Sequence, residues 1–202
     1  MKKITDIKEQ AKNKKRVSIY LDGEFYCGLD LVTAVKNRLK VGEFIQEETL
    51  VQIQCDSEMQ ACFDKALTFI SSAVRTEKQI KDRLIKYGYL EEIVVKAIEK
   101  LKSYGYVDDE DYAKRYASTY KGVKGKRLIK LELKQKGVSE KDAETALSDI
   151  ERQQEACDRL AEKYLKNKEK DQKNILKCYK YLLSKGFDYD EAKQAVDKFN
   201  DN

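Results

Sequence analysis

Apolar residues recur along this chain at an interval of 49 residues, and a glycine marks the same point of each copy. Gly88, Gly137 and Gly186 each follow a leucine by four residues. The other matching positions, all apolar or aromatic, are Leu67, Tyr116 and Leu165; Ile80, Ile129 and Cys178; Ala97, Ala146 and Ala195; Ile98, Leu147 and Val196; and Leu101, Ile150 and Phe199. Their spacing within a copy is that of one face of an α-helix. The pattern therefore predicts three copies of one helical unit.

Each unit is expected to contain three helices. The expected ranges are 61–74, 77–87 and 91–103 in the first copy, 110–123, 126–136 and 140–152 in the second, and 159–172, 175–185 and 189–201 in the third. The repeated glycine, placed directly after the second helix, can take the left-handed conformation that ends a helix. Residue pairs suited to capping a helix start are Thr76 with Gln79, Ser139 with Asp142, and Asp188 with Glu191.

A three-helix unit of this size exposes apolar surface, which neighbouring units bury when they stack in a line. The predicted fold is therefore mostly α, with three tandem three-helix repeats in an elongated, curved array and a small module in front of them. Such an array offers a long surface for a polymer or a protein, and we expect it to be a monomer.

The first sixty residues follow a different pattern. Two β-prone runs, 17–21 and 24–27, flank Asp22-Gly23, which is a strong signal for a β-hairpin. Helices are expected near 29–39 and 46–56, with a turn ending at Gly42. The predicted domains are an N-terminal hairpin and helix module over 1–60 and three-helix repeats over 61–108, 109–156 and 157–202.

Charge is segregated along the chain, although the net charge is only +5. Residues 41–64 hold six acids and no Lys or Arg, whereas residues 121–136 hold seven basic residues and one acid. Residues 163–185 hold eight lysines and two acids. Such asymmetry can orient a molecule on a polyanion.

Composition argues against catalysis. The chain has no histidine, and its five cysteines, which we interpret as reduced and mostly packed, lack metal-site spacing. The acidic run 108–111 could bind Mg²⁺, but capping of a helix by Asp108 is the favoured interpretation. No cofactor, no metal and no enzymatic activity are expected. Because no apolar run is long enough to span a membrane, a cytoplasmic location is expected.

A cationic helix face in the second repeat is the main candidate for phosphate contact. Lys126, Arg127, Lys130 and Lys134 recur at helical spacing opposite an apolar face. The alternative is a merely solvated face. The full set of candidate contact residues for a filament or DNA is Arg75, Arg115, Lys121, Lys124, Lys126, Arg127, Lys130 and Lys134.

Particular motifs resemble the RecX family, the bacterial regulators of the RecA recombinase. The matching residues are Leu67, Arg75, Ile80, Leu84 and Tyr87-Gly88-Tyr89; then Leu101, Tyr104-Gly105-Tyr106-Val107-Asp108-Asp109 and Tyr112-Ala113; then Gly125-Lys-Arg127, Ile129, Leu133 and Lys136-Gly137-Val138. The resemblance covers about 61–200, and the hairpin module is similar to the N-terminal extension of Gram-positive members. The third copy departs most, because no Asp-Asp link precedes it.

The resemblance implies a nonenzymatic modulator in recombination, DNA repair and the SOS response. It would bind RecA and its filament on single-stranded DNA, contact that DNA directly or through the filament, and inhibit strand exchange and ATP hydrolysis. Two alternatives stay open: a sequence-nonspecific DNA-binding protein of tandem helix-turn-helix-like units without a recombinase partner, and a helical protein adaptor.

Overall fold

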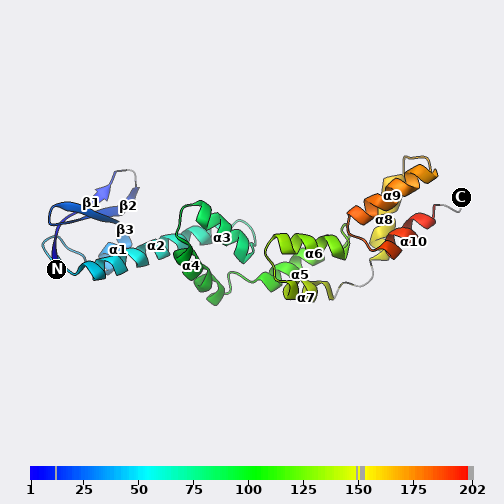
Figure 1. Cartoon of the computed structure of the whole chain (residues 1–202). Coiled ribbons are helices and arrows are strands. Elements are labelled where there is room, and N and C mark those ends of the chain that lie inside the picture. Colours follow the sequence, from blue (N-terminus) through cyan, green and yellow to red (C-terminus); the bar gives the residue numbers. More distant parts are fainter. Residues whose placement is uncertain (12, 149, 151–152, 200–202) are drawn as a thin grey trace. The chain divides into compact units, whose positions relative to one another are not determined.

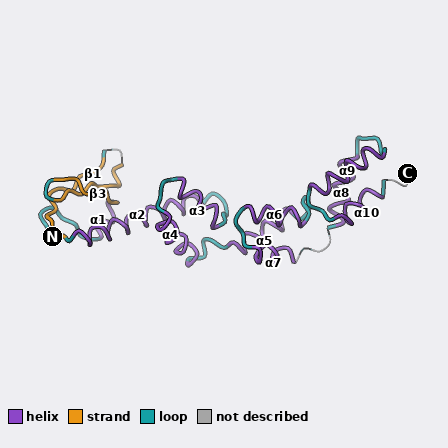
Figure 2. The backbone as a smooth tube through the Cα atoms, viewed as in Figure 1, coloured by secondary structure: helices purple, strands orange, loops and turns teal. Residues whose placement is uncertain are grey.

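The structure is a computed structural model that describes residues 1–11, 13–148, 150 and 153–199. Over these residues it contains four strands near the N-terminus and ten helices after or beside them (Figures 1 and 2). The chain divides into two compact units. The first combines Met1–Ala73 with Ile80–Val107, and the second combines Val74–Gln79 with Asp108–Asn202.

The N-terminal module is an antiparallel sheet in the order β3-β2-β1-β4. Its strands are β1 (Lys2–Gln10), β2 (Asn13–Leu21), β3 (Glu24–Asp30) and β4 (Phe44–Ile45). The predicted hairpin is confirmed as β2 and β3, with Asp22 and Gly23 at φ values of 49° and 91° in the turn. Strands β1 and β4 were not predicted. One face of the sheet packs Ile4, Ile19 and Leu29 against Leu50 of the following long helix.

Two helices follow the sheet. Helix α1 (Leu31–Lys36) is shorter than the predicted 29–39, and Asp30 caps it by accepting the Val32 amide at 2.9 Å. Helix α2 (Glu47–Ile70) replaces the two separate helices predicted at 46–56 and 61–74. The chain between them holds no glycine or proline to break a helix, and the buried Ser57 hydroxyl accepts the Asp30 amide at 2.8 Å. One helix therefore serves both the sheet and the first repeat.

The first repeat consists of the second half of α2 with α3 (Glu77–Lys86) and α4 (Glu91–Ser103). The predicted second and third helices are thus found within one residue of their expected ends. The core includes Ala66, Ile80, Leu84, Ala97 and Leu101, all fully buried.

The second and third repeats lie in the second unit. Their helices are α5 (Asp109–Tyr120), α6 (Lys126–Gln135) and α7 (Glu140–Ser148), then α8 (Gln154–Leu165), α9 (Gln172–Ser184) and α10 (Tyr189–Asp197). The helices predicted at 159–172 and 175–185 were placed too late in the sequence, because α8 already ends at Leu165 and α9 already begins at Gln172. Asp171 caps α9 by accepting the Asn174 amide at 2.7 Å. Helices α7 and α10 end at Ser148 and Asp197, before the predicted ends at 152 and 201. Residues 149, 151–152 and 200–201 of these predictions lie outside the described residues.

The repeated turns after the second helices have the predicted geometry. Gly88, Gly137 and Gly186 have φ values of 91°, 92° and 85°. Each following residue donates its amide back to the carbonyl of the repeated leucine, as Val138 does to Leu133 at 3.1 Å. The predicted caps are also present: the Gln79 and Asp142 amides reach the hydroxyls of Thr76 and Ser139, and the Asp111 amide reaches the Asp108 carboxylate. The Asp188 amide donates to the Glu191 carboxylate.

Within the second unit, the start of one second helix meets the turn after the next. The Thr76 hydroxyl donates to the Lys136 carbonyl at 2.6 Å, and 49 residues later the Gly125 amide donates to the Lys185 carbonyl at 2.9 Å. Carbonyls at a helix end lack partners in their own helix, and each contact gives one of them a donor from the start of another helix, a hydroxyl at Thr76 and an amide at Gly125. The sequence repeat is thus matched by a repeated contact.

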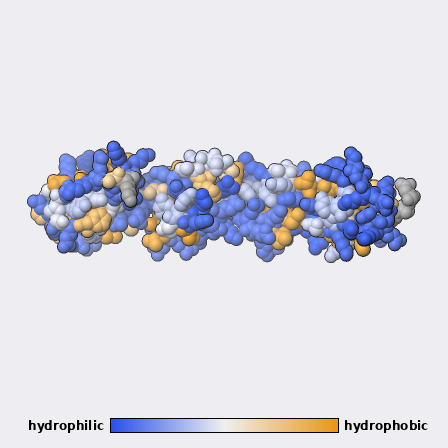
Figure 3. All heavy atoms as spheres, turned by 90° about the horizontal axis from the view of Figure 1, so that it is seen from above, coloured by the Kyte–Doolittle hydropathy of each residue, from blue (hydrophilic) through white to orange (hydrophobic). Residues whose placement is uncertain are grey.

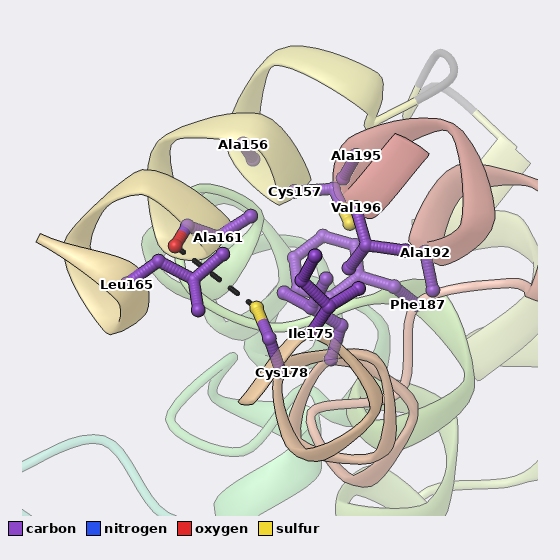
Figure 4. Packing of buried hydrophobic residues seen from close by; sticks show 11 residues of the cluster. Ala156, Cys157, Ala161, Leu165, Ile175, Cys178, Phe187, Ala192, Ala195 and Val196 are labelled. Atoms are coloured by element: carbon purple, nitrogen blue, oxygen red, sulfur yellow. Dashed lines mark hydrogen bonds between the residues drawn. The ribbon is translucent and has the colours of Figure 1, made fainter. Parts of the chain in front are cut away.

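The third repeat is closed by a core of small and large apolar residues (Figure 4). Ile175 and Cys178 point from α9 toward α8 and α10, and the Cys178 thiol lies 4.0 Å from the Ala161 carbonyl. Burial raises the pKa of the Cys178 thiol to about 11 and that of Cys157 to about 12. Four of the five cysteines are buried and Cys55 is exposed. The buried thiols therefore pack as small apolar side chains, as predicted.

Candidate nucleic-acid interface

Helix α6 places the candidate cations on the side away from the core. Ile129 and Leu133 are fully buried, whereas Arg127 and Lys134 are exposed. Gly125, the N-cap residue before the helix, is buried, and the Arg127 amide donates to the Gly186 carbonyl at 3.3 Å. Because the backbone of this first turn is held against the third repeat, the directions of its side chains are fixed by the fold.

Arg127 contacts the third repeat as well. Its guanidinium carbon lies 5.4 Å from the centroid of the exposed Tyr189 ring. This cation–π contact occupies one side of the planar guanidinium and leaves its N–H groups directed elsewhere. Arg127 can therefore still offer paired donors to a phosphate.

Lys130 is not free on this face. Its ammonium group forms ion pairs with Glu144 at 2.7 Å and Glu140 at 3.0 Å, both on α7. Two hydrogen bonds raise the pKa of Lys130, and the one to Glu144 contributes more than the one to Glu140. The helical pattern of α6 alone could not reveal these pairs, because the two acids come from another helix.

Lys124 belongs to a partly buried polar cluster between α5 and α6. Its ammonium lies 2.7 Å from Glu132 and 4.0 Å from the centroid of the Tyr120 ring. Tyr116 donates its hydroxyl to the same carboxylate at 2.7 Å. Burial raises the pKa of Glu132, but the hydrogen bonds from Lys124 and Tyr116 outweigh it and hold that pKa below its usual value. Lys124 thus links the end of α5 to α6 through its contacts with Tyr120 and Glu132.

The other candidates are scattered over the second unit. Arg115 is exposed and pairs with Asp111 one turn earlier, at 2.7 Å. Lys121 is exposed beyond the end of α5. Arg75 lies half-buried near Tyr112. Burial raises the pKa of Tyr112, and the charge of Arg75 opposes this rise without cancelling it. Among the described residues, Lys121, Lys126 and Lys134 form no ion pair, so with Arg127 they are the cations best able to take an anion.

A second row of lysines, which the sequence analysis did not select, lies on α9. Lys173, Lys177 and Lys180 are exposed and occupy the side opposite the buried Ile175 and Cys178. The signal was present in the basic stretch 163–185, since four- and three-residue spacing puts these lysines on one helical face.

Comparison with known protein families accounts for nearly the whole chain. The model described as the regulatory protein RecX N-terminal domain matches residues 2–46, and those of the first, second and third RecX three-helix domains match 62–101, 108–147 and 151–196. The chain belongs to the RecX family. The resemblance inferred from the sequence is therefore confirmed, and it includes the divergent third repeat.

Individual RecX proteins are similar over their full length. The regulatory protein RecX of Clostridium perfringens (strain 13) is 35% identical, covering 100% of this chain and 98% of its own length. That of Clostridium botulinum (strain Alaska E43) is 34% identical over 97% of this chain and 95% of its own length. Full-length similarity supports one common domain order.

Solved RecX structures share the fold. A crystal structure of regulatory protein RecX has a TM-score of 0.73 and 28% identity, covering 98% of this chain and 100% of its own. The crystal structure of RecX from Lactobacillus salivarius has a TM-score of 0.64 and 30% identity, covering 71% of this chain and 97% of its own. The mostly helical fold with an N-terminal strand module is therefore that of the RecX family.

The RecX domain assignment also locates the two cationic rows. The α6 row lies in the second three-helix domain, and the α9 row lies in the third. Among the helices described in this structure, none combines the length and the apolar character needed to cross a membrane.

Proposed function

We propose that this chain binds the RecA recombinase and the filament that RecA forms on single-stranded DNA, and inhibits strand exchange and ATP hydrolysis there. The observation that carries the proposal is family membership over four consecutive domains of a family whose members are named as regulatory proteins. The RecA partner itself comes from the resemblance noted in the sequence.

In this proposal the protein acts by binding, as a cytoplasmic monomer without cofactor or catalysis. The filament contacts are the exposed Lys121, Arg127 and Lys134 and the half-buried Lys126, because each can approach a phosphate without breaking an ion pair in the described structure. Lys124 and Lys130 support the fold of the second repeat instead, through Glu132 and through the two glutamates of α7.

The proposal is tested by RecA ATP hydrolysis on single-stranded DNA across a salt series. The variant Lys126→Gln, Arg127→Gln, Lys134→Gln removes three positive charges from α6 and leaves its ion pairs intact. We expect weaker inhibition of ATP hydrolysis. The slope of log affinity against log salt should also fall by about 0.7 for each lost contact with a single strand. A parent protein that leaves ATP hydrolysis and strand exchange unchanged would overturn the proposal.

The matched control is Lys86→Gln, Lys96→Gln, Lys141→Gln, which removes the same charge from three exposed lysines on α3, α4 and α7. It should inhibit as the parent does. If the two variants are equally impaired, net charge alone explains the effect and the α6 face is not the contact.

A second candidate function is nonspecific DNA binding without a recombinase partner, favoured by the presence of two lysine rows on different domains. The two functions differ in their dependence on concentration. Inhibition of RecA at concentrations too low to bind naked DNA supports the recombinase partner. Inhibition only where naked DNA is bound supports the alternative.

A further inference from the structure

The lysine row on α9 lacks any partner within the described protein. Helix α9 carries Lys173, Lys177 and Lys180 on its exposed face and has no acidic residue between Gln172 and Ser184. None of the three forms an ion pair or a ring contact among the described residues. The nearest acid in sequence, Asp171, uses its carboxylate to cap the helix at the Asn174 amide.

Other lysines of the same repeat do have partners. The ammonium of Lys168 lies 3.2 Å from the centroid of the Tyr164 ring, and that of Lys185 lies 5.4 Å from the Tyr181 ring. Lys198 pairs with Asp158. In contrast to these three lysines, the row on one face of α9 has no partner among the described residues.

The placement of these lysines does not stabilise the helix. Lys173 lies in the first turn, where the helix dipole favours an anion, and Lys177 lies one turn further with the same charge. A helix rises 1.5 Å per residue, so the three ammonium groups start from positions about 6 Å and 4.5 Å apart along the axis. That spacing suits successive phosphates of one strand, which are about 3.4 Å apart along B-DNA and further apart when the strand is extended.

A shallow, open groove with a mainly apolar lining lies beside the row. It is lined by Gln172, Leu176 and Tyr179 of α9 and by Lys193 and Val196 of α10. Leu176 is 53% exposed, and Tyr179 is half-buried against the core of the repeat. Hydrophilic side chains predominate on the face shown at this end of the molecule (Figure 3). An aromatic ring next to a cationic row is the combination that binds an unstacked base together with its backbone.

We propose that the α9–α10 face of the third repeat binds single-stranded nucleic acid. Lys173, Lys177 and Lys180 hold consecutive phosphates, and Tyr179 and Leu176 receive bases in the groove. A duplex keeps its bases stacked and cannot use the groove, so the site favours the single strand. This site does not depend on a recombinase, and it is distinct from the cations of α6.

The first test is fluorescence anisotropy of a labelled oligo-dT and of a labelled duplex of equal length, without RecA, over a salt series. The variant Lys173→Gln, Lys177→Gln, Lys180→Gln should lower the slope of log affinity against log salt for the single strand by about 2. The control Lys86→Gln, Lys96→Gln, Lys141→Gln should leave the slope and the affinity as in the parent. An unchanged slope in the α9 variant overturns the proposal, as does a parent protein that binds no single strand.

The second test separates base contact from charge. Tyr179→Leu keeps an apolar side chain against the core but removes the stacking surface, so we expect affinity for oligo-dT to fall about tenfold and affinity for the duplex to stay the same. Circular dichroism and a melting curve check that the repeat stays folded. Equal affinity of the parent for both DNAs, with no effect of Tyr179→Leu, overturns the groove as a base site. Either result leaves the RecA proposal to be judged by ATP hydrolysis alone.

Discussion

The second helices of the second and third repeats, α6 and α9, each present a row of lysines, but the surroundings of the two rows differ. On α6, Lys130 is bound by Glu140 and Glu144 of the neighbouring helix. On α9, Lys173, Lys177 and Lys180 have no ion-pair partner among the described residues. A basic stretch in a sequence can thus contain lysines that are held in ion pairs and lysines that are not. Only the acids of neighbouring helices decide which kind a given lysine is.

The cores of the two repeats differ as well. Buried alanines belong to the core of both repeats, and in the second repeat Ile129 and Leu133 are the largest fully buried side chains. The polar cluster of Tyr116, Lys124 and Glu132 adds hydrogen bonds beside them. In the third repeat, Leu182 and Phe187 belong to the same buried cluster as Cys157 and Cys178; Figure 4 shows Phe187 within this cluster. Among the described residues, the largest fully buried side chains of the third repeat are Leu165, Leu182 and Phe187, one more than in the second repeat.

The largest effect is expected from Leu133→Asp. The substitution removes a fully buried side chain and buries an unpaired carboxylate, which costs several kcal/mol, comparable with the stability of a domain. We expect urea denaturation followed by circular dichroism to show loss of the second repeat. Leu131→Asp, on the same helix but 52% exposed, is the control and should change little. Equal denaturation curves for Leu133→Asp and the parent would show that the core face of α6 is wrongly assigned.

A smaller effect is expected at the repeated turns. Gly137→Ala and Gly88→Ala both place a side chain at a positive φ, which costs about 1–2 kcal/mol. At Gly137 the new methyl group also collides with the side chain of Lys78, whereas at Gly88 no atom lies within 4 Å of it. Gly137→Ala should therefore lower the free energy of unfolding more than Gly88→Ala does. The comparison fails if the two losses are equal.

The elements that were predictable from the sequence are those fixed by local chemistry. The Asp22-Gly23 hairpin, the glycine turns and the caps at Thr76, Ser139 and Asp108 each depend on residues within a few positions of one another. The 49-residue period then allowed the helices predicted for the first unit to be predicted for the other two. These features need no knowledge of distant contacts.

The features that were not predictable depend on residues far apart in sequence. Strand β1 pairs with β2 and β4 but lacks a clear alternating pattern of its own. The continuity of α2 depends on Ser57 meeting the end of β3. The partners of Lys130 lie 10 and 14 residues away on another helix. The helical pattern of α6 grouped Lys130 with the other cations of its face, because that pattern carries no information about acids on α7.

A moderate, pH-dependent effect is expected from Tyr116→Phe. The Tyr116 hydroxyl donates to the Glu132 carboxylate, whose pKa is held below its usual value, so this contribution is present above about pH 4.3 and is lost as the pH falls through the folded pKa. The variant should lose about 1 kcal/mol at pH 7. Measured by chemical denaturation, the difference from the parent should shrink at pH 3.5. A difference that is constant with pH would show that Tyr116 acts only through packing.

The smallest effects distinguish the two lysine rows directly. Lys177→Gln removes an unpartnered charge, so it should leave thermal stability unchanged and lower the single-strand salt slope by about 0.7. Lys130→Gln leaves Glu140 and Glu144 without their shared cation, so it should lower the melting temperature slightly and leave that slope unchanged, because this lysine is already neutralised. The hydrogen bonds that raise the pKa of Lys130 also lower that of Glu140, so the pKa of Glu140 should rise in Lys130→Gln, which an NMR titration can follow. If the two substitutions have the same effect on the salt slope, the ion pairs on α7 do not withhold Lys130 from nucleic acid, and the distinction between the two rows is lost.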